Sequence, residues 1–356
     1  MSNAGRRGAE SNHASRFDVC TRRAFDDGWQ TLAEPLPPRP TTVTAQHARS
    51  IISYNQSPDL GFDRSINPYQ GCEHGCIYCF ARPTHAYLNL SPGLDFETRL
   101  FYKSNAAALL DQELRKPGYR PARLVVGANT DPYQPIERRL GITRAVLRVL
   151  AAFHHPLTVV TKGALVERDV DVLAPLAAQS LASVCVSVTT LDAALKRDLE
   201  PRAAAPAARL RVIRRLSDAG VPVTVLFSPV IPFVNDAEME RVLSAAADAG
   251  ARAAGYIFLR LPREVAPLFE EWLKARYPLK AAHVMSRVRQ SCGGRDYDAA
   301  FGTRMRGQGV FADLLRQRFR VACRRFGLAG ERPVLRNDLF SVPPREGDQL
   351  ELFTSR

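Results

Sequence analysis

The chain has 356 residues, of which 46% are hydrophobic, and this length suits one large α/β domain or two smaller ones. No run of apolar residues approaches the roughly 18 that a membrane-spanning helix needs, and the first residues lack the hydrophobic stretch of a secretory signal. The seven cysteines are an odd number in a chain too long to depend on disulfides. We therefore expect a cytoplasmic protein that does not bind a membrane.

The chain is strongly basic, with 49 Lys and Arg against 36 Asp and Glu and a formal net charge of +13. A basic balance favours partners that carry phosphate, DNA among them. An arginine bias of the coding sequence would give the same count, and net charge does not show whether the basic residues cluster. DNA is therefore an expected partner that charge alone does not establish.

Residues 1–45 combine Arg, Ser and Asn with a Pro-rich run and show no sustained periodicity, which predicts a flexible basic arm. From Asn67 to about Pro262, short β-branched runs alternate with amphipathic helical stretches. The predicted strands are 124–127, 157–161, 184–188, 223–227 and 255–259. The predicted helices are 105–116, 142–153, 169–178, 206–219 and 236–249.

Apolar strands that are joined by helical crossovers predict a parallel sheet built from right-handed βαβ units. About six units can be counted from the segment before Cys72 onward, which is too few for a closed eight-unit barrel. We therefore predict the α/β class, with a partial, open (β/α)6 TIM-like barrel over residues 46–265 that binds ligands at the carboxyl ends of its strands. Residues 266–330 are expected to form a helical and Gly/Arg-rich C-terminal extension, and residues 331–356 a flexible tail.

Three cysteines, Cys72, Cys76 and Cys79, lie within eight residues and follow an extended segment. Three thiolates at this spacing can wrap one face of a cubane cluster, and the neighbouring glycines allow the tight turn. Such a loop leaves one iron without a protein ligand, and an open metal position is where chemistry takes place. A zinc site completed by His74 or His85 is the alternative, but structural zinc usually pairs two separated knuckles. The pattern therefore favours a 4Fe-4S cluster.

The order Cys72, three residues, Cys76, two residues, Cys79, with the aromatic Tyr78 before the last cysteine, resembles the radical S-adenosylmethionine (SAM) superfamily. The resemblance covers roughly residues 60–265. It implies that SAM is the second cofactor and that a reductant such as flavodoxin or ferredoxin supplies an electron. It further implies that the bond from sulfur to C5′ breaks and that the resulting 5′-deoxyadenosyl radical takes hydrogen from a substrate.

Within the superfamily the chain is most similar to the spore photoproduct lyase group of DNA repair proteins. The similarity is carried by Asn67–Cys72, Tyr78–Pro83, Gly127–Pro135 and Val160–Gly163. It implies a damaged or modified nucleic acid as substrate. The lyase itself needs a cysteine near the end of its second strand, where this chain has Ala128, Asn129 and Thr130. The sequence therefore departs from the lyase at the residue that returns hydrogen to the lesion.

Several polar residues stand where the resemblance places the cofactor. Tyr78 would lie against the adenine, or pack as an ordinary core aromatic. Lys162 and Ser187 stand at strand ends, where a cation and a hydroxyl could hold the methionyl carboxylate, although a lysine at a strand end is also ordinary. Asn129 and Asp131 could bind ribose hydroxyls or the amino group, or form a turn.

Arg202, together with Glu200 and Arg209, flanks the helix after the fourth strand and could reach the cofactor carboxylate. Ion pairs along the helix face are an equally good interpretation of these residues. The Gly- and Arg-rich segment Arg295–Gly309 suits contact with phosphate or closure over a substrate, or it caps the open side of the barrel.

The segment Gln349–Phe353 resembles the short peptide with which bacterial repair proteins bind the DNA polymerase sliding clamp, or it packs as an amphipathic end of the chain. The preferred hypothesis is thus a radical SAM enzyme that acts on damaged or modified nucleic acid. Radical modification of a peptide or small metabolite is an alternative. A non-catalytic iron–sulfur protein that binds DNA or the clamp is another.

Overall fold

The computed structural model describes residues 7–18, 40–330 and 334–345. The Pro-rich run near Pro35 and the clamp-like segment Gln349–Phe353 lie outside the described residues. Inside the predicted N-terminal arm, residues 7–18 contact the folded chain, and a strand begins at Thr42. The predicted domain boundaries stay predictions.

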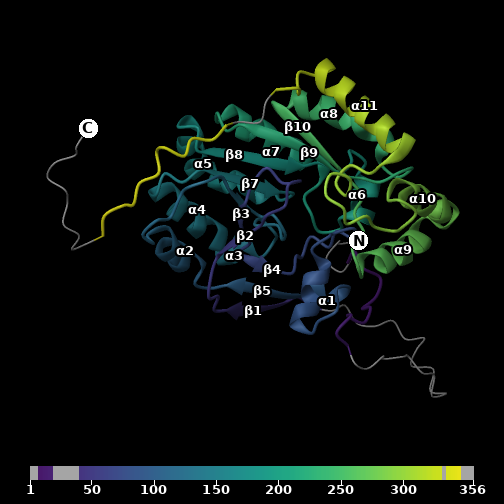
Figure 1. Cartoon of the computed structure of the whole chain (residues 1–356), viewed down its shortest axis with the longest axis horizontal. Coiled ribbons are helices and arrows are strands. Elements are labelled where there is room, and N and C mark those ends of the chain that lie inside the picture. Colours follow the sequence, from purple (N-terminus) through teal and green to yellow (C-terminus); the bar gives the residue numbers. More distant parts are fainter. Residues whose placement is uncertain (1–6, 19–39, 331–333, 346–356) are drawn as a thin grey trace.

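A seven-stranded sheet forms the centre of the molecule, in the order β10-β9-β8-β7-β6-β3-β2 (Figure 1). All neighbours in it are parallel except β2, which pairs antiparallel with β3. The strands are β2 (Ile52–Tyr54), β3 (Arg64–Ile66), β6 (Leu124–Val126), β7 (Leu157–Thr161), β8 (Ala182–Ser187), β9 (Val223–Val230) and β10 (Ala253–Phe258). Six parallel strands from β3 to β10 confirm the predicted α/β class with about six units.

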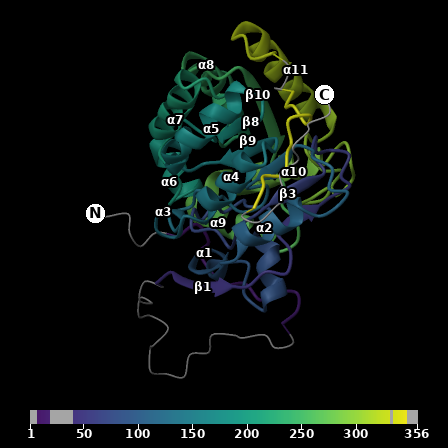
Figure 2. The ribbon, with the colours of Figure 1, turned by 90° about the vertical axis from the view of Figure 1, so that its left-hand side faces the viewer.

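Helices pack around the outside of this sheet, and the longer ones do so through an apolar stripe (Figures 1 and 2). In α4, for example, Val146, Leu147 and Leu150 are fully buried. The helices are α1 (Leu94–Thr98), α2 (Ala106–Leu114), α3 (Glu137–Leu140), α4 (Ile142–Ala152), α5 (Val170–Ala178), α6 (Ala193–Leu199), α7 (Pro206–Asp218), α8 (Met239–Asp248), α9 (Val265–Arg276), α10 (Pro278–Ser291) and α11 (Gly309–Arg325). Short 3₁₀ helices are η3 (Arg82–Leu88), η4 (Ala164–Asp169) and η5 (Asp236–Glu238). None of the described helices is both long and apolar enough to cross a membrane.

A second, three-stranded sheet lies below the first together with α1 (Figures 1 and 2). Its order is β1 (Thr42–Gln46), β5 (Arg99–Lys103) and β4 (Tyr69–Gln70). Only Asn67 and Pro68 separate β4 from β3, so the small sheet carries the chain from the first parallel strand directly to Cys72. The cysteine segment is therefore fixed at the carboxyl end of β3.

The stretch 334–345, drawn in yellow, runs back across the molecule from the side of α11 (Figure 1). The Arg336 N–H donates to the carbonyl of Ser180 at 2.9 Å, and the Ser341 N–H donates to the carbonyl of Phe153 at 3.1 Å. Both acceptors follow helices and precede strands, so this stretch lies at the amino-terminal side of the sheet. The cysteine segment lies at the opposite side, at the carboxyl ends of the strands.

Candidate functional site

The cysteine loop, residues 71–80, is buried and tightly turned. Gly71 and Gly75 adopt left-handed φ values of 76° and 67°, which residues with a side chain rarely adopt. The Cys72 N–H donates to the carbonyl of Phe96 at 2.9 Å, and Cys72 and Cys76 are each 7% exposed. Contacts within the protein thus anchor the loop to α1.

The three thiols fit a cationic cluster. Burial raises the pKa of Cys72, Cys76 and Cys79, and the pKa of Cys72 is raised further by Asp131 and by the other two cysteines. These buried thiols are neutral while they keep their protons, and iron would replace those protons on binding. The donor set of three thiols is the one that the sequence predicts for a 4Fe-4S cluster.

The two histidines that could complete a zinc site each contact another group through one ring nitrogen. His74 Nδ1 lies 3.4 Å from Asp131 Oδ2, and His85 Nε2 lies 2.9 Å from the carbonyl oxygen of Arg99. Among the described residues, no group of three or more His, Cys, Asp and Glu side chains is arranged to hold a single metal ion.

A fully buried ion pair between Arg82 and Glu97 packs against the cysteine loop and holds its backbone. Arg82 Nε donates to the carbonyl of Cys76 at 3.0 Å, and Arg82 Nη2 donates to Glu97 Oε1 at 2.5 Å. The carboxylate of Glu97 also accepts the N–H groups of Gly8 and Ala9, each at 2.8 Å. One carboxylate therefore joins the N-terminal segment to the loop, a link that sequence reasoning missed because its partners are 89 residues apart.

We expect Gly75→Ala to weaken both the fold and the loop. A Cβ at Gly75 would lie 2.7 Å from Glu97 Oε2, and the left-handed φ costs a non-glycine residue roughly 1–2 kcal/mol. Gly118→Ala is the matched control, because Gly118 has φ 80° and its Cβ would meet no atom within 4 Å. Denaturant unfolding should show a loss for both variants, whereas iron content after reconstitution should fall only for Gly75→Ala. Equal iron content in the two variants would contradict the inference that Glu97 supports the loop.

Two of the predicted cofactor residues, Tyr78 and Lys162, are brought together by Glu200. Lys162 Nζ lies 3.3 Å from Glu200 Oε1 and 5.7 Å from the centroid of the Tyr78 ring. The Tyr78 hydroxyl donates to the same carboxylate oxygen. Thr189, which sequence reasoning did not single out, donates from Oγ1 to Glu200 Oε1 at 2.6 Å. Its signal was its position just beyond the fourth parallel strand.

Glu200 is fully buried and paired with Arg209, which is itself 2% exposed. Burial raises the pKa of Glu200, but Arg209 and Lys162 outweigh this effect and hold the pKa well below its usual range. Arg209 also donates to the carbonyl of Ser187 at 3.0 Å. Ser187 is thus buried beside the same network, which its carbonyl joins.

Asp131 uses both carboxylate oxygens in a turn. Its Oδ1 accepts from the Tyr133 N–H at 2.8 Å and from Thr161 Oγ1 at 2.7 Å, and its Oδ2 accepts from the Lys162 N–H at 2.6 Å. Burial raises its pKa, but His74 and these donors leave it below the ordinary value. The contacts favour the turn-forming interpretation, in which Asp131 positions the backbone of Lys162.

The remaining predicted residues stand apart from the Tyr78–Lys162 pair. Asn129 is exposed, and its N–H donates to Asn67 Oδ1 at 2.8 Å. Arg202 Nη2 donates to Glu73 Oε1 at 2.7 Å, which places the guanidinium beside the cysteine loop. The structure therefore assembles Tyr78, Lys162 and Ser187 at one network and leaves these two at its edges.

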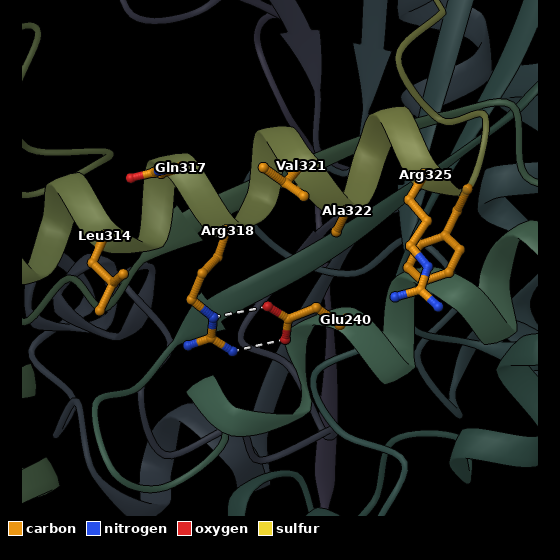
Figure 3. A pocket seen from close by; sticks show the side chains of 8 residues that line it. Glu240, Leu314, Gln317, Arg318, Val321, Ala322 and Arg325 are labelled. Atoms are coloured by element: carbon orange, nitrogen blue, oxygen red, sulfur yellow. Dashed lines mark hydrogen bonds and ion pairs between the residues drawn. The ribbon is translucent and has the colours of Figure 1, made fainter.

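A hollow between α8 and α11 is lined by residues of these two helices and by Phe326 (Figure 3). Arg318 donates to both oxygens of Glu240 across it, at 2.8 and 2.7 Å. Its lining contains no residue that the sequence predicted for the site. The cysteine loop and the neighbouring strand ends are thus the candidate active site.

Buried thiols at the carboxyl end of a parallel sheet lie where barrel enzymes bind their cofactors, which defines the class as an iron–sulfur enzyme on a partial α/β barrel. The model of the Radical SAM superfamily matches residues 66–246, and the chain belongs to this superfamily. Its members use a 4Fe-4S cluster and SAM and need a reductant. The predicted cofactors are therefore confirmed at the level of the family.

The chain also has relatives in sequence and solved structures with a similar fold. Uncharacterised proteins of Mycobacterium tuberculosis and Mycobacterium bovis are 39% identical over 233 residues, which cover 65% of this chain and 67% of theirs. Spore photoproduct lyase complexed with dinucleoside spore photoproduct has a similar fold, with a TM-score of 0.59, 15% identity and coverage of 80% of this chain and 79% of the lyase. A point mutant of the lyase gives a TM-score of 0.58 at 16% identity, with the same coverage.

Proposed function

We propose that this chain cleaves SAM reductively and directs the radical to a damaged or modified nucleic acid. The observation that carries the proposal is the similarity in fold to spore photoproduct lyase across 80% of the chain, because one of those lyase structures holds a dinucleoside lesion. The net charge of +13 supports a substrate that carries phosphate. The proposed substrate class is thus inferred from the similarity in fold to the lyase.

In this mechanism the residues of the cysteine loop hold the cluster. Cys72, Cys76 and Cys79 would hold the 4Fe-4S cluster, which when bound supplies the electron that splits SAM into methionine and a 5′-deoxyadenosyl radical. Arg82 and Glu97 fix the loop backbone between these cysteines, so that the ligands are held before the cofactor arrives.

Residues at and near the strand ends would bind SAM. Lys162 keeps part of its surface exposed, at 16%, and its Nζ can donate to a carboxylate of SAM while Glu200 balances its charge. The ring of Tyr78 offers an apolar face beside it. Roles for Asn129, Ser187 and Arg202 in binding SAM stay predictions, as does a sliding-clamp partner.

The substrate that we propose differs from the spore photoproduct. The lyase relay needs a cysteine near the end of the second strand, and here Ala128, Asn129 and Thr130 follow β6. Burial raises the pKa of Cys292 to about 11, so this thiol keeps the S–H bond that a hydrogen-atom donor needs, but it stands at the end of α10 and not at this strand end. A hydrogen donor other than a cysteine of this strand end is therefore required.

The test is whether nucleic acid stimulates SAM cleavage. The reconstituted, reduced enzyme is incubated with SAM and with undamaged, UV-irradiated, oxidised or alkylated DNA, and 5′-deoxyadenosine is quantified. We expect one damaged DNA to raise the yield above that with undamaged DNA. Stimulation by a peptide or metabolite fraction, with no response to any nucleic acid, would refute the proposed substrate class.

A further inference from the structure

The Gly- and Arg-rich segment 293–308, which joins α10 to α11, lies at the open side of the barrel. The Phe258 N–H, at the end of β10, donates to the carbonyl of Met305 at 2.9 Å. The Arg304 Nε donates to Asp59 Oδ2 at 2.6 Å, and the Gly302 N–H donates to Asp59 Oδ1 at 2.7 Å. Asp59 lies in the connection between β2 and β3, so the segment contacts both edges of the seven-stranded sheet.

Arg260 stands just beyond the carboxyl end of β10 and faces two aromatic rings. Its guanidinium carbon lies 5.1 Å from the centroid of the Phe80 ring and 5.8 Å from that of Tyr297, whose hydroxyl accepts from Arg260 Nη2 at 3.2 Å. Phe80 directly follows Cys79 in the chain. Arg260 Nε is buried and has no hydrogen-bond partner among the residues that the structure describes.

The aromatic rings beside these arginines remain open to solvent. Phe80 is 41% exposed and Phe301 is 59% exposed, and the guanidinium carbon of Arg304 lies 4.6 Å from the centroid of the Phe301 ring. Asp59 pairs with Arg304, and the charge of Arg260 also lowers the pKa of Asp59, so a single carboxylate faces two guanidinium groups and leaves one positive charge unbalanced. We name the five residues Phe80, Arg260, Tyr297, Phe301 and Arg304 the aromatic–arginine rim.

We propose that the aromatic–arginine rim binds an unpaired nucleotide of a nucleic-acid strand, with its base on the Phe301 ring and an adjacent phosphate on Arg260 and Arg304. Exposed aromatic rings stack single bases, and guanidinium groups bind phosphate, whereas a closed duplex hides the faces of its bases. The inference rests on the proposed function and deepens it, because it specifies a single-stranded or locally opened substrate. The rim adjoins Cys79 through Phe80, so the bound nucleotide is held beside the cysteine loop.

The test is equilibrium binding of the reconstituted enzyme, under anaerobic conditions, to fluorescently labelled oligonucleotides. The probes are a single strand of mixed sequence, the same strand with abasic positions, and the corresponding duplex. We expect Phe301→Ala to weaken binding of the base-bearing strand about tenfold and to leave the abasic strand unchanged. We expect Arg260→Ala to weaken both strands and to lower the salt dependence by about one phosphate contact.

Two matched variants control for exposure and charge. Tyr54→Ala removes an aromatic ring that is 64% exposed and lies near Arg64 outside the rim, and Arg211→Ala removes an exposed arginine from α7. If Phe301→Ala keeps the wild-type ratio of affinities for the base-bearing and the abasic strand, the proposed role of the rim is wrong. The proposed function survives that result if the wild type binds DNA. Failure of the wild type to bind any of the probes would overturn the rim and count against a nucleic-acid substrate as well.

Discussion

Replacement of Cys76 by alanine is expected to abolish the cluster and with it the cleavage of SAM. Cys76 is the middle ligand of the loop, and Arg82 and Cys79 both donate to its carbonyl. Changes to groups that merely support metal ligands cost about 10- to 100-fold in affinity, so removal of a ligand should lower 5′-deoxyadenosine formation by more than about 100-fold. Iron and sulfide content, visible absorbance and 5′-deoxyadenosine yield are measured on the same anaerobic samples.

The matched control for this prediction is Cys292→Ala. Cys292 is 6% exposed, against 7% for Cys76, so both changes remove a buried thiol of similar exposure. Only the change at Cys76 should remove iron. Retention of a full cluster by Cys76→Ala, or equal losses in the two variants, would show that the loop does not ligate the cluster as predicted.

The parallel strands were predictable from the sequence because β-branched runs between amphipathic helices leave few alternatives. β7, for example, starts and ends where the Leu157–Thr161 run does. Parallel strands also place their carboxyl ends together, which is why Tyr78 and Lys162 could be expected near one another. α10 lies within the extension that was expected to be partly helical, and its own signal is present, since Pro278 stands in its first turn and buried apolar residues follow with helical spacing.

The partners of buried charges were not predictable, because such pairs depend on contacts between distant parts of the chain. An arginine near the third cysteine looks like any other basic residue, and only the fold buries Arg82 completely against Glu97. Asp131 shows the same limit, since its neighbours in sequence indicate a turn but not the additional bond from Thr161. Local pattern therefore indicated the turn but not the network.

Replacement of Arg209 by methionine is expected to destabilise the fold by about 3–5 kcal/mol, because it leaves the buried carboxylate of Glu200 without its main partner. Lys162, at 3.3 Å, would be the remaining cation beside that carboxylate in the described network. Arg211→Met on the same helix is the control, since Arg211 is 62% exposed and its pair with Glu167 should be worth less than about 1 kcal/mol. Denaturant unfolding of the two variants and the wild type measures both changes.

The pH dependence of this loss distinguishes a lost ion pair from lost packing. The folded pKa of Glu200 lies below the ordinary value of about 4.3, so the unfolded chain binds its proton first on acidification. The contribution of Glu200 is therefore complete above about pH 5 and is lost as the pH falls through the folded pKa. Without Arg209, burial pushes the pKa of Glu200 upward, and this stabilisation disappears from the variant.

The difference in unfolding free energy between wild type and Arg209→Met should therefore be largest above about pH 5 and should shrink towards pH 3. Adding Glu200→Gln to Arg209→Met should recover part of the loss at neutral pH, because the uncompensated charge is then removed. A loss that stays constant from pH 7 to pH 3, and that Glu200→Gln does not relieve, would assign the role of Arg209 to packing. A loss below about 1 kcal/mol at neutral pH would show that the network around Glu200 does not depend on this ion pair.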